Sequence, residues 1–246
     1  MTPPSASPAV SIVIPCFNEQ DNIVALAEEV ANACSGRDYE IVVVDDASTD
    51  ASVARLRDAR GFLGARLRVV RHLRNQGQSA SVCTGVDHAR APVIATLDGD
   101  GQNDPADIPR LLEALAASAQ AADLIVCGYR RKRRDTWVKR WSSRIANTVR
   151  AAALGDGTPD TGCGLKVFHR QLFLALPRFN HMHRFLPALV RRAGGHSQSV
   201  EVNHRPRLHG QSKYGVGNRL WVGIVDLLGV MWLQRRRFRA GGATED

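Results

Sequence analysis

The stretch Glu40-Ile-Val-Val-Val-Asp-Asp46 decides the fold class of this 246-residue chain. Four β-branched apolar residues run directly into two carboxylates, which is typical of a strand buried on both faces of a parallel sheet. Runs of similar character occur at Val10–Ile14, Leu67–Arg71 and Val93–Leu97. The sequence therefore predicts at least four buried strands, each ending at polar residues.

Helical spacing of apolar residues separates these strands. Asp21–Ala33 has this spacing behind Asp21, which we expect to be the N-cap, and further helices are expected near Asp50–Arg60 and from about Gly77. Alternating strands and helices predict an α/β fold, with a Rossmann-like, mostly parallel central sheet flanked by helices. Later in the chain we expect strands at Asp123–Cys127 and Ser197–Val202, helices at Trp137–Leu154 and Arg184–Arg192, and a Gly-rich turn at Thr158–Lys166.

Charge divides the chain into two unlike halves. Residues 1–129 hold 10 Lys and Arg against 17 Asp and Glu, whereas residues 130–246 hold 23 against 7. An acidic half suits metal ions, and a basic half suits phosphates or an anionic membrane. The five cysteines form no CxxC pair, so neither a zinc site nor a disulfide framework is indicated.

Polar clusters follow three of the predicted strands, at Asn18-Glu19, Asp45-Asp46 and Asp98–Asp104. Ligands of parallel sheets bind outside the carboxyl ends of the strands, so we expect the three clusters to share one edge. Strand geometry with a period of two would point Asp98 and Asp100 the same way. Carboxylate and amide oxygens are ligands for Mg²⁺ or Mn²⁺, and Gln102 would add an amide oxygen.

Four motifs in this part of the chain carry a family resemblance: Pro15-Cys-Phe-Asn-Glu19, Val44-Asp-Asp-Ala-Ser48, Arg74-Asn-Gln-Gly77 and Asp98-Gly-Asp-Gly-Gln102. Their order resembles that of family 2 glycosyltransferases of the GT-A fold. The set is most similar to the dolichyl-phosphate mannosyltransferase branch and its bacterial polyprenyl-phosphate relatives. The resemblance runs from about Val10 to Leu233, and four motifs in order are far more specific than any one alone.

The resemblance implies a role for each matching residue. A nucleotide-sugar donor would bind at this edge, with a Mg²⁺ or Mn²⁺ ion bridging its diphosphate. The implied nucleotide contacts are Pro15, Phe17 and Glu19 in the pocket, Asp46 at the base or ribose, and Arg74 at the nucleoside. The implied metal ligands are Asp98, Asp100 and Gln102, and Asp100 would also be a catalytic residue.

The acceptor side is expected in the basic half. Arg207-Leu-His-Gly-Gln-Ser212-Lys213 resembles the R-x-x-G-x-S-K segment of the same branch, and its cations suit the phosphate of a polyprenyl phosphate. Asp160-Thr-Gly-Cys-Gly164 resembles the turn of the same family that faces the donor sugar and the acceptor, which implies that Asp160 is an active-site carboxylate. A phosphomonoester is largely ionised at neutral pH, with a second pKa near ~6, so inverting displacement by its oxygen needs no general base.

The apolar stretch Leu220–Leu233 has 14 residues, about 21 Å as a helix, which is shorter than a bilayer core of ~30 Å. Trp221 and Trp232, with arginines beyond the stretch, favour an interfacial helix at the cytoplasmic face of the inner membrane. The alternative is a helix buried in the core or in a dimer. The expected organisation is a disordered tail at 1–9, a GT-A domain at 10–214, an amphipathic acceptor-side extension with a basic tail at 215–239, and a disordered end at 240–246.

The sequence gives less support to other functions. A transferase with a soluble or polysaccharide hydroxyl acceptor would need a general base, for which Asp160 is the first candidate. A nucleic-acid-binding protein would use Arg130–Arg134, but the sequence has no RNP, zinc-finger or helix-turn-helix pattern and only 6% aromatic residues. No GxGxxG follows the first strand, which excludes a typical dinucleotide site. The transferred sugar, expected to be a hexose, and its GDP or UDP carrier stay open.

Overall fold

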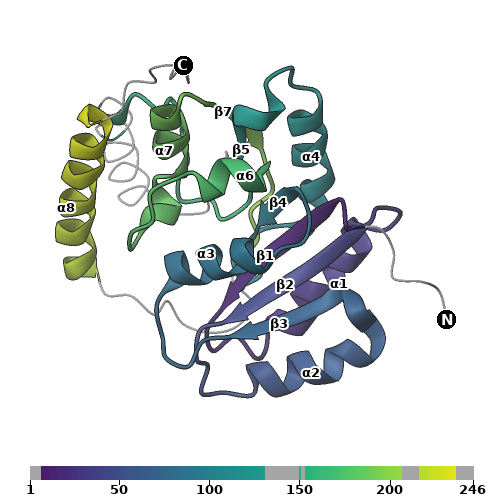
Figure 1. Ribbon diagram of the computed structural model, residues 1–246. Coiled ribbons are helices and arrows are strands. Elements are labelled where there is room, and N and C mark those ends of the chain that lie inside the picture. The colour runs from purple at the N-terminus through teal and green to yellow at the C-terminus, as the bar shows by residue number, and fades with distance from the viewer. Residues whose placement is uncertain (1–6, 131–149, 151–152, 207–215, 237–246) are drawn as a thin grey trace, which may run out of the picture.

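The computed structural model describes residues 7–130, 150, 153–206 and 216–236. Within them, a single seven-stranded sheet crosses the molecule in the order β3-β2-β1-β4-β6-β5-β7 (Figure 1). The strands are β1 (Val10–Cys16), β2 (Tyr39–Asp45), β3 (Leu67–Arg71), β4 (Val93–Thr96), β5 (Leu124–Tyr129), β6 (Lys166–His169) and β7 (His196–Glu201).

The sheet is mostly parallel, as the sequence predicts. β1 pairs in parallel with β2 and β4, β2 with β3, and β5 with β7. β6 runs antiparallel to both of its neighbours, β4 and β5. The sequence did not predict β6, because Lys166–His169 has four residues with a polar side chain at each end and so lacks the long apolar run of the other strands.

Helices connect and cover the strands. The described helices are α1 (Ile23–Ala33), α2 (Ser52–Leu63), α3 (Gln78–His88), α4 (Ile108–Ala116), α6 (Arg170–Leu174), α7 (Leu186–Ala193) and α8 (Val216–Arg235). α4 was not predicted, although its buried residues Ile108, Leu111 and Leu115 recur at helical spacing. Most of the predicted helix at Trp137–Leu154 lies outside the described residues.

One helix end differs from the predictions. The N-cap of α1 is Asn22 and not Asp21, whose carboxylate instead lies 3.1 Å from the Arg55 guanidinium on the surface. α8 lies within the segment 215–239, and it begins at Val216, before the apolar stretch that starts at Leu220.

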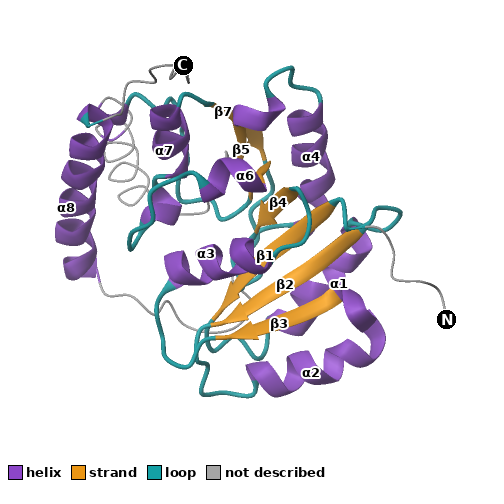
Figure 2. Ribbon diagram, viewed as in Figure 1, coloured by secondary structure: helices purple, strands orange, loops and turns teal. Residues whose placement is uncertain are grey.

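Helices cover both faces of the sheet (Figure 2). Apolar side chains form a core between the helices and the sheet on each face. Because side chains alternate along a strand, Ile12 and Ile14 of β1 join the core under α1, α2 and α4. Val13 joins the opposite core, under α3, α6 and α7. This double coverage explains why β1 and β2 are apolar almost throughout.

Gly85 lets α3 approach β1 closely. A Cβ atom at this position would lie 2.3 Å from Cγ1 of Val13, which is a severe overlap. Since Val13 is completely buried, its side chain has no open space into which to move.

We therefore predict that Gly85→Ala lowers the free energy of unfolding by about 1–3 kcal/mol, the usual cost of overpacking a core. Gly61→Ala in α2 is the matched control, since nothing lies within 4 Å of its added methyl group. Alanine should there be neutral or stabilise by up to about 1 kcal/mol. Urea unfolding followed by circular dichroism measures both, and equal stability of the two variants would contradict the packing described.

Candidate active site

The carboxyl ends of β1, β2 and β4 meet at one edge of the sheet and bring the three polar clusters together. Cys16 and Asp45 are register partners, and the Asp46 amide donates to the Cys16 carbonyl at 2.8 Å. The turn after β4 touches the end of β1, since a Cβ on Gly99 would lie 2.6 Å from the Pro15 carbonyl oxygen. Only glycine fits this approach without a shift of the backbone.

The loops after β1 and β2 are interlocked by side chain to backbone hydrogen bonds. The Asn18 amide donates to Ser48 Oγ at 2.9 Å, and Asn18 Oδ1 accepts from the Thr49 amide at 2.8 Å. The buried carboxylate of Glu19 accepts from Asn22 Nδ2 at 2.7 Å. Pro15 and Phe17 are half-buried at this edge.

Asp46 is buried and holds the turn that follows β3. Its Oδ1 accepts from the Gln76 amide and its Oδ2 from the Gly77 amide, both at 2.8 Å. Nδ1 of His72 lies 2.7 Å from Oδ1. The carboxylate that the sequence assigns to the base or ribose therefore anchors the turn that carries Arg74, which is exposed.

Asp98 and Asp100 lie in the turn after β4, which ends at Thr96. The expectation that a strand period of two aligns them is wrong, because the residues do not continue the strand. They are nevertheless close: burial, and then the charge of Asp100, raise the pKa of Asp98 to about 6. The Asp100 carboxylate also accepts from the Gln102 amide at 3.1 Å, which folds the turn back on itself.

This turn fits a divalent cation. The described part of the chain has no group of three or more His, Cys, Asp or Glu placed to hold a metal ion. Two carboxylates of like charge are present, however, and a cation between them would relieve their repulsion. Mg²⁺ is commonly held by one or two carboxylates together with substrate phosphates and water, so Asp98 and Asp100, with the side chain of Gln102, are a suitable set.

Two cations lie near the acidic turn: the half-buried Arg130 after β5 and the buried Lys166 at the start of β6. Their charges oppose the rise in the pKa of Asp98. Lys166 is buried, and its Nζ donates to the carbonyls of Thr161 and Cys163. The sequence interpretation missed both residues, since Arg130 was taken as part of a basic loop and Lys166 as the end of a turn. Only the antiparallel direction of β6 brings Lys166 to this edge.

Asp160 is paired with Arg130. Its Oδ2 accepts from Arg130 Nε at 2.6 Å and its Oδ1 from a terminal nitrogen of the same guanidinium at 2.9 Å. Burial lowers the pKa of Arg130, but these hydrogen bonds outweigh burial and the pKa is raised. Both oxygens thus already accept bonds from a permanent cation, and a carboxylate held by a cation is a weaker base than a free one.

The predicted phosphate ligands Arg207, Ser212 and Lys213 lie outside the described residues. The chain that leads to them is described, however, and it runs beside the acidic turn. The Arg205 amide donates to the Gln102 carbonyl at 3.0 Å, and its guanidinium bonds Asp104 at 2.6 Å. The predicted acceptor segment therefore starts two residues from a contact with the candidate metal turn.

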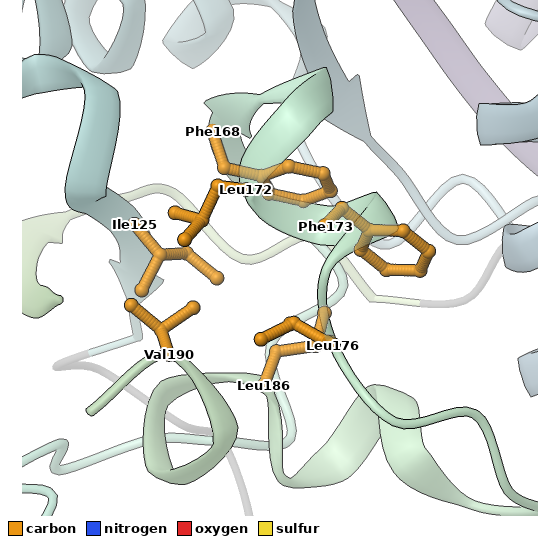
Figure 3. A pocket seen from close by; sticks show the side chains of 7 residues that line it. All are labelled: Ile125, Phe168, Leu172, Phe173, Leu176, Leu186 and Val190. Carbon is orange, nitrogen blue, oxygen red and sulfur yellow. The ribbon is translucent and has the colours of Figure 1, made fainter. Parts of the chain in front are cut away.

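A pocket elsewhere in the molecule is apolar and belongs to the core. It is lined by Ile125, Phe168, Leu172, Phe173, Leu176, Leu186 and Val190 (Figure 3). The rings of Phe168 and Phe173 stack beside it with centroids 5.3 Å apart. None of the seven side chains offers a hydrogen bond, so the pocket does not suit a nucleotide or a sugar.

We predict that Arg130→Met lowers the free energy of unfolding by about 3 kcal/mol, because it leaves the buried Asp160 carboxylate without its cation. In Arg130→Met/Asp160→Asn the second change removes that charge, so part of the loss should be regained. Denaturant unfolding of the two variants and the wild type measures the difference. A double variant less stable than Arg130→Met would contradict the assignment of a buried, mutually dependent pair.

Comparison with known proteins agrees with this geometry. Residues 11–176 match the family model described as "Glycosyl transferase family 2". The chain is 39% identical over 243 residues to the dodecaprenyl-phosphate galacturonate synthase of Rhizobium johnstonii, covering 97% of this chain and 71% of that protein. It is 37% identical over 209 residues to the undecaprenyl-phosphate 4-deoxy-4-formamido-L-arabinose transferase of Edwardsiella ictaluri, covering 84% of this chain and 63% of that protein.

Solved structures show the same fold at low identity. Glucosyl-3-phosphoglycerate synthase from Mycobacterium tuberculosis, in complex with Mg²⁺ and uridine diphosphate, aligns with a TM-score of 0.68 at 15% identity. The alignment covers 92% of this chain and 79% of that one. The complex of the same enzyme with Mn²⁺, uridine diphosphate and phosphoglyceric acid also gives 0.68, at 18% identity, over 95% and 81% of the two chains.

Proposed function

The chain belongs to glycosyl transferase family 2, and from this premise we propose that it transfers a sugar from a nucleoside-diphosphate donor to a polyprenyl phosphate. One observation carries the proposal: the Asp98–Asp100 turn lies at the carboxyl edge of the sheet, directly beside the chain that leads to Arg207 and Lys213. A site for a donor diphosphate and a site for an acceptor phosphate would thereby be neighbours.

The relatives support this class of acceptor and widen the range of sugars. The two named above are described as acting with dodecaprenyl and undecaprenyl phosphate, on galacturonate and on 4-deoxy-4-formamido-L-arabinose. The chain spans 71% and 63% of their lengths. A uronic acid or an amino-pentose is therefore as good a candidate as the hexose expected from the sequence.

The residues fit an in-line displacement without proton transfer. The phosphate oxygen of the acceptor is already ionised, so it attacks the anomeric carbon while the nucleoside diphosphate leaves from the opposite face. A bound Mg²⁺ or Mn²⁺ would neutralise the charge that develops on the leaving diphosphate. Arg130 keeps Asp160 ion-paired, which suits a site without a general base. This pairing weighs against the alternative of a hydroxyl acceptor.

Incubation with radiolabelled nucleotide sugars, with and without undecaprenyl phosphate, tests the proposal. The panel should include UDP-galacturonate, UDP-glucose and GDP-mannose. We expect label in the organic extract for at least one donor, only when the lipid phosphate is present. Label that enters only water-soluble products, or transfer to undecaprenol in place of its phosphate, would contradict the proposed acceptor.

Metal dependence is a separate prediction. Transfer should stop in EDTA and return with Mn²⁺ or Mg²⁺. It should fall at least about a hundredfold in Asp100→Ala, because the cation that neutralises the leaving diphosphate would lose one of its ligands. Asp38→Ala is the control, since it removes an exposed carboxylate just before β2, at the opposite end of the sheet. Full turnover in EDTA would exclude the cation, and an equal loss in both variants would show a non-specific effect.

We also propose that α8 lies on a membrane surface, because its two faces differ. The inner face carries Leu227, Val230 and Met231, which pack in the core under α3, α6 and α7. α7 also holds the helix, since Arg192 Nε donates to the Leu233 carbonyl at 2.8 Å (Figure 1). The outer face leaves four apolar side chains between 41% and 59% exposed: Ile224, Val225, Leu228 and Trp232.

The membrane is the occupant that the flanking charge favours. Arg235 and Arg236 follow the apolar face and are exposed, and cations beside an apolar stripe suit an anionic leaflet. Within the described residues, no helix combines the length and the apolar character needed to cross a membrane. A helix held to the domain on one side and apolar on the other would bring the site to a lipid substrate.

Vesicle flotation tests this placement. The protein should float with phosphatidylglycerol vesicles and less with phosphatidylcholine, and added salt should weaken binding through screening. Leu228→Ser/Trp232→Ser should abolish flotation, whereas Phe62→Ser should not, because Phe62 is an equally exposed apolar residue on α2. Binding that survives the double change would place the membrane contact elsewhere, and no binding by the wild type would favour a protein partner for this face.

A further inference from the structure

Gln78 reaches the candidate metal site from outside the acidic turn. It is the first residue of α3, and its Nε2 donates to Oδ1 of Asp98 at 2.7 Å. Gln78 follows the Arg74–Gly77 motif and has no part in the roles assigned so far. Its contact with Asp98 joins two segments that are 20 residues apart in the chain.

The first turn of α3 is held in place by contacts that do not involve the Gln78 side chain. On one side, the Gly77 amide donates to Oδ2 of Asp46 at 2.8 Å. On the other, Ser79 Oγ lies 2.7 Å from Nδ1 of His183. Burial lowers the pKa of His183 to about 3, so its ring is neutral and its Nδ1 shares a hydrogen bond with the Ser79 hydroxyl. Gln78 thus projects from a rigid turn and not from a free loop.

The Asp98 carboxyl group is also confined from a second side. A Cβ on Gly164 would lie 2.3–2.4 Å from all three atoms of that carboxyl group. Gly164 is itself fixed, because its carbonyl accepts from Thr96 Oγ1 at 2.7 Å. The Asp98 carboxylate therefore lies between the side-chain amide of Gln78 and the backbone of Gly164. These two contacts restrict its rotation.

We propose that Gln78 is a positioning residue that fixes the orientation of the Asp98 carboxylate toward the cation and the donor diphosphate. Its amide engages Oδ1 and leaves Oδ2 clear of this bond, so Oδ2 would be the oxygen better placed to hold the cation. Groups of this kind, which bond a metal ligand and not the metal, typically change metal affinity 10- to 100-fold when removed. The inference rests on the metal-dependent transfer proposed above.

Mn²⁺ binding measures the effect directly. Free Mn²⁺ is followed by electron paramagnetic resonance as it is titrated into the protein with UDP or GDP, whichever the wild type binds more tightly. Gln78→Leu removes the donor at nearly constant size, and we expect its Mn²⁺ dissociation constant to rise 10- to 100-fold. Turnover at saturating Mn²⁺ should stay within about threefold of the wild type, because the ligands themselves are intact.

Two further variants complete the experiment. Gln76→Leu is the matched control: the Gln76 side chain is exposed, and its contact with Asp46 uses the backbone amide. Its Mn²⁺ affinity should be unchanged. Gly164→Ala disturbs the same carboxylate from the other side and should weaken Mn²⁺ binding in the same way. Thermal unfolding of each variant confirms that it is folded.

The outcomes separate the two proposals. Wild-type affinity in both Gln78→Leu and Gly164→Ala, or an equal loss in Gln76→Leu, would overturn the positioning role while leaving the cation in place. Failure of the wild type to bind Mn²⁺ with either nucleotide would overturn the cation itself, and the positioning role with it. A selective loss in the first two variants supports both.

Discussion

The close approach of backbone to the Asp98 turn is the constraint on which the site depends. Gly99 lies against the end of β1, and Gly164 lies against the Asp98 carboxyl group, each with no room for a side chain. These two contacts bring together the end of β1, the turn after β4 and the segment that precedes β6. Because glycine stands at both contacts, the backbone packs closely around the turn while Asp98 and Asp100 stay half-buried.

This packing also sets the electrostatics of the edge. Burial alone would make two neighbouring carboxylates costly, and the structure places Arg130 and Lys166 behind them. Arg130 is in turn held by Asp160, so each buried charge has an opposite charge nearby. The proposed transfer would accordingly rest on fixed charges at this edge and not on a mobile proton.

Sequence alone predicted much of the fold and the gathering of the polar clusters at one edge of the sheet, because both depend on local patterns. Apolar runs show the buried parallel strands, and the polar residues that end them must share one edge. Lys166 and Gln78 could not be found in this way. Lys166 reaches the site through a short strand without an apolar run, and Gln78 through a contact between separate segments. The proximity of Asp98 and Asp100 was predicted for a wrong reason, since a turn and not a strand aligns them.

The C-terminal helix shows the same limit from another side. Its sequence suggested either membrane contact or burial, and α8 has one face packed on the core and one exposed apolar face that could meet a membrane. Periodicity could not separate the faces, because Val230 and Leu228 are equally apolar in sequence. Which face of α8 points inward is decided by its contacts with α7 and with the core under α3, α6 and α7.

The central claim is that Asp98 and Asp100 hold a cation that meets the donor diphosphate. Crystals grown with Mn²⁺ and UDP, measured at the manganese absorption edge, test it most directly. The account predicts an anomalous peak about 2.0–2.3 Å from a carboxylate oxygen of Asp98 or Asp100 and in contact with the diphosphate. Ordered nucleotide at this edge without a manganese peak, or a peak at another carboxylate, would contradict it.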